Sequence, residues 1–89
     1  MVDEYRSQID VIDTQLLVLL NQRVTLAARL GALKAQAGMP RRDKERERGV
    51  LAKVLSANTG PLDHKGVTKI FECIITESRR AQNRLLKSV

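Results

Sequence analysis

Six polar side chains fall at positions where the periodicity of the sequence predicts apolar ones. They are Arg23, Lys34, Asp43, Glu47, Ser78 and Gln82. At about 100° per residue in a helix, they share faces with neighbouring leucines, isoleucines and valines. A buried charge without a partner is unfavourable, so these side chains should converge on each other or on a ligand. Two cations, two acids and two neutral hydrogen-bonding groups suit a small polyanion that carries hydroxyl groups.

Each of these residues also has an ordinary structural explanation. Arg23 occupies a heptad core position, where it could pair with an acid from another helix. Ser78 could bond back to its own helix, and Asp43 could simply cap a helix. The ordinary explanations are harder to sustain for six residues in three segments, so we interpret the set as a candidate binding site.

The densest charged stretch contributes only a few members to this set. Eight consecutive charged residues run from Arg41 to Arg48. Helical spacing places Asp43 and Glu47 inward, with Arg46 beside that face. The other members are expected to be solvated, with Arg41 and Arg42 preceding the helix.

The element that must position Arg23 and Lys34 is a long helix from Asp3, a possible N-cap, to about Ala37. Gly38 followed by Pro40 would end it. At 1.5 Å per residue it spans roughly 50 Å. Its apolar seam has a heptad pattern and consists of Tyr5, Ile9, Ile12, Leu16, Leu19, Arg23, Leu26, Leu30, Leu33 and Ala37.

Two shorter helices are predicted, one from near Asp43 to before Asn58 and one from near Asp63 to the carboxyl end. Their predicted inward residues are Val50, Leu51, Val54 and Leu55, and then Val67, Ile70, Phe71, Ile74, Ile75, Leu85 and Leu86. These helices cannot cover the whole seam, so a second copy of the chain is the simplest cover. We therefore predict one all-α domain over residues 1–89, with three helices and a homodimer built on the long one.

Composition narrows the class of partner. The chain has 89 residues and a formal net charge of +6, so an anionic partner is plausible. One cysteine, Cys73, and one histidine, His64, argue against a zinc site and a Cys–His nucleophile. The charged amino terminus lacks an apolar signal core, and no apolar run was expected to cross a membrane. We expect a cytoplasmic protein without a metal.

The ordered motifs resemble those of the all-helical class of chorismate mutase from Arg6 to Gln82. In order, the residues are Arg6, Ile9, Asp10, Ile12, Asp13, Leu16, Leu17, Leu19, Leu20, Arg23, Gly31, Lys34, Pro40, Asp43, Arg46, Glu47, Ile74, Ile75, Glu77, Ser78 and Gln82. The resemblance implies an intertwined homodimer with two active sites that convert chorismate to prephenate, on the route to phenylalanine and tyrosine. It implies that Arg6 enters each site from the other chain.

The resemblance also implies residue roles. The substrate-binding residues would be Arg6, Arg23, Asp43, Arg46 and Ser78, and the catalytic ones Lys34, Gln82 and Glu47. The rearrangement is unimolecular, so no cofactor, nucleophile or general base is needed; the site must hold the folded dicarboxylate and stabilise charge on the breaking ether oxygen. The arginines would clamp carboxylates and Ser78 would help to hold one. Lys34 and Gln82 would donate to the ether oxygen, and Glu47 would receive the ring hydroxyl.

Three alternatives stay open. An isochorismate pyruvate lyase would share the clamp arginine and the loop lysine, but Asp43, Arg46, Glu47 and Ser78 favour the mutase. A nucleic-acid-binding module would suit the charge, yet the chain has almost no aromatic residues for base stacking. A subunit that needs a partner enzyme of the same pathway is the third.

Overall fold

The structure is a computed structural model that describes residues 1–40 and 42–87. The side chains are described only as far as residue 85. It consists of helix α1 (Val2–Gln36), helix α2 (Lys44–Ala57) and helix α3 (His64–Lys87), and the described residues contain no strand. The prediction of an all-α chain with one very long helix is confirmed. Arg41, residues 88–89 and the side chain of Leu86, for which the sequence made predictions, lie outside the described part.

Short polar side chains set two of the three helix starts. Asp43 Oδ1 accepts a hydrogen bond from the Arg46 backbone N–H at 2.9 Å, which caps α2. Asp63 Oδ1 does the same for Gly66 at 2.7 Å in the first turn of α3. The predicted cap at Asp3 was wrong: α1 already begins at Val2, so Asp3 lies in the first turn, where a carboxylate complements the helix dipole. Gly38, at φ 71°, follows the end of α1 as predicted.

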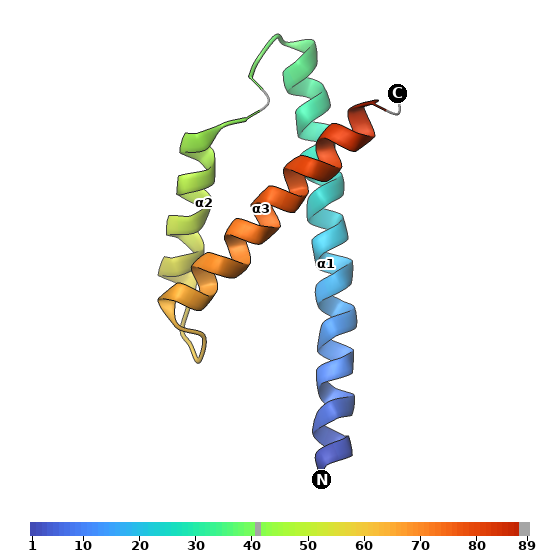
Figure 1. The fold of residues 1–89 in the computed structure, drawn as a ribbon, viewed down its shortest axis with the longest axis vertical. Coiled ribbons are helices and arrows are strands. Elements are labelled where there is room, and N and C mark those ends of the chain that lie inside the picture. The colour runs from blue at the N-terminus through green and yellow to red at the C-terminus, as the bar shows by residue number, and fades with distance from the viewer. Residues whose placement is uncertain (41, 88–89) are drawn as a thin grey trace.

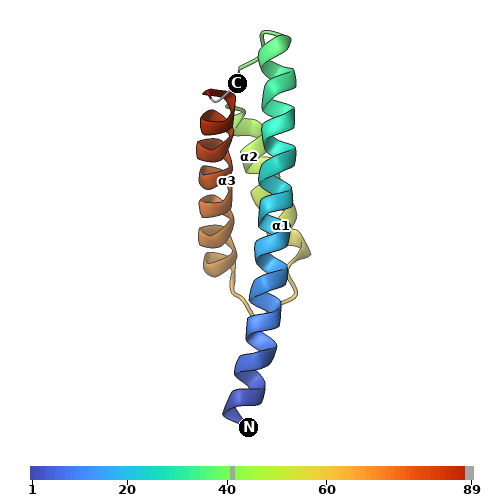
Figure 2. The same cartoon turned by 90° about the vertical axis from the view of Figure 1, so that its right-hand side faces the viewer.

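Helix α3 holds the other two helices together. It crosses α1 obliquely, and α2 packs against it (Figures 1 and 2). Within the described residues no Cα atom of α1 lies within 8 Å of a Cα atom of α2. The buried side chains of this small core all belong to α3: Val67, Ile75, Ser78, Ala81 and Gln82. The architecture therefore leaves α1 and α2 as two walls joined through α3.

Much of the apolar seam of α1 is exposed. The amino-terminal part of α1 extends beyond the other two helices (Figure 1), and Gly31 is the helix's single buried residue. The seam residues Tyr5, Ile9 and Leu19 are 64%, 54% and 60% exposed. Ile70 and Leu85, which were predicted to face inward, are also exposed. So large an apolar surface is typical of an interaction site.

The expectation that no segment is apolar enough to cross a membrane was wrong for α1. An 18-residue window of this helix has a mean hydropathy of 1.3. One such helix is weak evidence for a membrane span, since helices of soluble proteins reach the same value. The finding shows that α1 is unusually apolar for a helix with so few buried residues.

Candidate active site

A cavity of about 280 Å³ opens between the three helices. Its apolar wall comes from Leu26, Ala27, Leu30, Val50 and Ile75. Its polar wall contains seven of the eight residues singled out in the sequence: Arg23, Lys34, Asp43, Arg46, Glu47, Ser78 and Gln82. Helical spacing on three separate segments thus brings three cations, two acids, a hydroxyl and an amide to one cavity.

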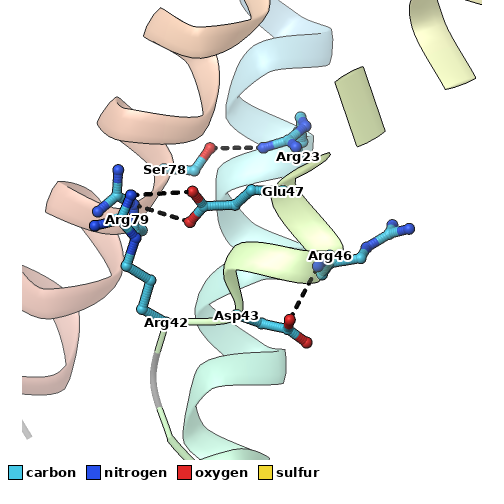
Figure 3. Close-up of polar contacts among 7 residues, drawn as sticks. All are labelled: Arg23, Arg42, Asp43, Arg46, Glu47, Ser78 and Arg79. Atoms are coloured by element: carbon cyan, nitrogen blue, oxygen red, sulfur yellow. Dashed lines mark hydrogen bonds and ion pairs between the residues drawn. The ribbon is translucent and has the colours of Figure 1, made fainter. Parts of the chain in front are cut away.

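Arg23 and Ser78 connect α1 to α3 in this cavity. Arg23 Nη1 donates to Ser78 Oγ at 2.8 Å (Figure 3), and Ser78 is buried. The arginine in the heptad seam therefore pairs with a hydroxyl rather than an acid, and the serine does not bond back to its own helix. A guanidinium has five N–H donors, and in the described part of the chain Arg23 makes no other hydrogen bond. The remaining donors are available to a carboxylate.

Glu47 lies between two arginines. Arg42 Nη2 is 3.4 Å from Oε1, and Arg79 Nε is 3.3 Å from Oε2 (Figure 3). The carboxylate side chain is only 21% exposed. Two neighbouring cations offset the cost of placing this charge in a half-buried position. An ionised carboxylate at this wall can accept a hydrogen bond from a ligand hydroxyl.

Asp43 both caps α2 and lines the cavity, so its two explanations are compatible. Asp43 was predicted to face inward. It does line the cavity, but the residue as a whole is exposed rather than buried. Its cap fixes the first turn of α2, which carries Arg46 and Glu47. The Arg46 side chain extends away from Asp43 (Figure 3), and its guanidinium makes no hydrogen bond or ion pair within the described residues.

Lys34 and Gln82 supply donors that the described residues do not use. Lys34 is half-buried and Gln82 is 8% exposed. Neither side chain makes a hydrogen bond or an ion pair with the described residues. Gln82 packs directly on α1 at Gly31, where a Cβ atom would overlap the Gln82 amide nitrogen and lie 2.6 Å from its Cδ. The absence of a side chain at residue 31 thus makes room for Gln82.

Arg6 is the exception among the predicted residues. It lies on the amino-terminal turns of α1, 4.0 Å from Asp3 and 74% exposed, and it does not line the cavity. The cavity of this chain is therefore assembled without it.

Arg79 was not among the residues singled out in the sequence. It lines the cavity and its side chain is 33% exposed. A signal was present: residue 79 follows Ile75 by four and precedes Gln82 by three, so all three share one helix face. No group of three or more potential metal ligands occurs among the described residues.

Comparison with known proteins identifies the family. The family model described as chorismate mutase type II matches residues 5–83. The chain belongs to this family. The family's reaction is an isomerisation of chorismate, and the resemblance seen in the sequence is confirmed.

Relatives of two kinds support the assignment. The chorismate mutase of Methanocaldococcus jannaschii is 31% identical, over 94% of this chain and 86% of the relative. The bifunctional chorismate mutase/prephenate dehydratases of Aquifex aeolicus and Escherichia coli are 46% and 35% identical, over 82% and 92% of this chain. The chain spans about a fifth of the length of these bifunctional relatives.

The fold also matches a solved chorismate mutase. The form II structure from Thermus thermophilus superimposes with a TM-score of 0.90 at 29% identity, over 93% of this chain and 94% of that one. The three-helix arrangement is therefore a chorismate mutase arrangement.

Proposed function

We propose that this chain is a chorismate mutase that converts chorismate to prephenate in the cavity between its three helices. The observation that carries the proposal is the set of seven polar side chains from three helices around one cavity, in a chain of the chorismate mutase family. We treat residues 1–89 as a single catalytic domain and place it in the cytoplasm, as predicted from the sequence.

The chemistry proposed for the cavity is electrostatic and conformational. Arg23, with Ser78, binds one carboxylate of chorismate, and Arg46 reaches the second. Lys34 and Gln82 donate to the ether oxygen as its bond breaks, which stabilises negative charge where it develops. Glu47, beside the capped turn at Asp43, accepts the ring hydroxyl. No step of this rearrangement uses a cofactor, since it is unimolecular and needs only a held conformer.

A homodimer completes the proposal. Helix α1 continues toward the amino terminus beyond α2 and α3 (Figure 2), and its apolar seam is exposed. A second α1 offers the same apolar heptads as cover. Two such helices would intertwine the protomers. Arg6, which lies far along α1 from the cavity of its own chain, would then enter the cavity of the partner as a further carboxylate ligand.

A pathway partner remains part of the proposal. Prephenate dehydratase shares a chain with chorismate mutase in the bifunctional relatives, so an enzyme that acts on prephenate is the expected partner.

The alternative activity for the same cavity is that of an isochorismate pyruvate lyase.

The proposal is tested by incubating the purified chain with chorismate and identifying the product by NMR, with isochorismate as a parallel substrate. Prephenate from chorismate supports the mutase. Pyruvate and salicylate from isochorismate, with chorismate left intact, would instead establish the lyase.

A further inference from the structure

Two consecutive residues of α3 link the other helices at the cavity. Ser78 accepts the hydrogen bond from Arg23 of α1, and Arg79 forms an ion pair with Glu47 of α2 (Figure 3). Because the backbones of α1 and α2 lie apart in the described residues, these two contacts link each of the two helices to α3 at the cavity. Ser78 was predicted as a ligand of the substrate, whereas no role had been assigned to Arg79.

The contact with Arg79 differs in kind from the contact that Glu47 makes with Arg42. Arg42 is five residues away in the segment before α2, and its side chain is 50% exposed. It therefore restrains Glu47 within its own part of the chain. Arg79 comes from a different helix and has a 33% exposed side chain, so it fixes the carboxylate relative to α3 and to the cavity.

The Nε atom of Arg79 is buried and has no hydrogen-bond partner in the described part of the chain. It lies 3.3 Å from Glu47 Oε2, close enough for an ion pair, but without the alignment of a hydrogen bond. A small rotation of either side chain would align them, and charge-assisted bonds of this type are among the stronger ones. Charge attraction therefore holds the pair in this structure.

We propose that Arg79 is a positioning residue that holds the Glu47 carboxylate at the cavity wall so that it can accept the hydroxyl of chorismate. The inference rests on the proposed function for its substrate. A carboxylate has about four acceptor sites, so two arginine contacts leave sites for the hydroxyl. A planar guanidinium suits this role better than a flexible ammonium does.

The test compares Arg79→Met with Arg80→Met. Arg80 is the adjacent arginine, paired with Glu77 at 2.7 Å on the exposed surface, so the control removes the same charge from the same helix. We expect Arg79→Met to lower kcat/KM roughly 10- to 100-fold, as misplaced groups do, and Arg80→Met to leave it near the wild-type value. Arg79→Lys should recover part of the loss. A loss no greater than that of Arg80→Met would overturn the proposal.

A double-mutant cycle separates positioning from direct substrate binding. In a Glu47→Gln background, Arg79→Met should change kcat/KM by less than about twofold, because residues that act as a unit are not additive. The same loss in both backgrounds would mean that Arg79 acts on the substrate itself, and the positioning role would be wrong.

Crystal structures supply a readout independent of turnover. In Arg79→Met, or in Arg79→Gln if the first variant does not fold, the Glu47 carboxylate should have left its place at the cavity wall. An unchanged Glu47 would contradict the inference. If the wild-type chain left chorismate unchanged, the proposed function would fail, and the place of Glu47 in these structures would still decide whether Arg79 positions it.

Discussion

At the scale of single residues, the cavity depends on one residue that has no side chain. Gly31 lets Gln82 lie against α1, and any Cβ there would overlap the Gln82 amide. Gly31→Ala should therefore displace Gln82, lower kcat by roughly tenfold or more and destabilise the fold, as overpacking does, by about 1–3 kcal/mol.

The matched control is Gly49→Ala. Gly49 is also helical, but a Cβ there would meet nothing within 4 Å. Since alanine favours helices over glycine by up to about 1 kcal/mol, this variant should unfold at the same or a higher temperature and keep its activity. Equal effects of the two substitutions, measured by thermal unfolding and steady-state kinetics, would refute the packing role of Gly31.

Gln82 also predicts the pH dependence of the reaction. An amide donates a hydrogen bond without titrating, so activity should not require acidic pH. In Gln82→Glu the new carboxyl donates only when protonated, so kcat should rise as the pH falls. pH–rate profiles of both proteins test this, and a wild-type enzyme active only at low pH would contradict it.

At the scale of elements, helix caps and stop signals could be predicted from the sequence because they act through residues that are neighbours in the chain. The cap at Asp43, the helix start near Asp63 and the stop at Gly38 were recognised, since each works within about four residues. Asp3 was misjudged because the first helix begins before it and needs no side-chain cap. The contact between Arg79 and Glu47 could not be predicted, since it depends on how α2 docks against α3.

The two aspartate caps provide a prediction at this scale. Asp43→Ala and Asp63→Ala should each lower the free energy of unfolding by about 1 kcal/mol, the usual contribution of an N-cap. Only Asp43→Ala should also raise KM, because the turn that it caps carries Arg46 and Glu47. Chemical denaturation measures the stability of the two variants, and steady-state kinetics measures their KM. An equal KM in the two variants would contradict the idea that the cap at Asp43 positions the cavity residues.

At the scale of the whole molecule, the sequence predicted more apolar surface than one chain can cover, and the structure leaves that surface exposed on α1. The residues of the seam were found by their heptad spacing. Their burial could not be predicted from spacing alone, since spacing shows which residues share a helix face but not what packs against that face.

Mixed dimers test both the dimer and the place of Arg6. Arg6→Ala and Arg23→Ala should each be nearly inactive alone. If Arg6 acts in the partner's cavity, a mixed dimer of the two has one intact site, so an equal mixture of freely exchanging chains should recover about a quarter of wild-type activity. No recovery, or a monomer by light scattering, would contradict the arrangement.

The central claim is that the cavity accelerates the rearrangement of chorismate through donors aimed at the developing charge, and the most direct measurement is kcat/KM for Lys34→Ala. The control is Lys53→Ala, which removes an exposed lysine of α2 that does not line the cavity. We predict that Lys34→Ala loses on the order of 10²–10³ in rate while remaining a folded dimer, and that Lys53→Ala stays near wild type. Near-normal conversion of chorismate to prephenate by Lys34→Ala would contradict this account of the site.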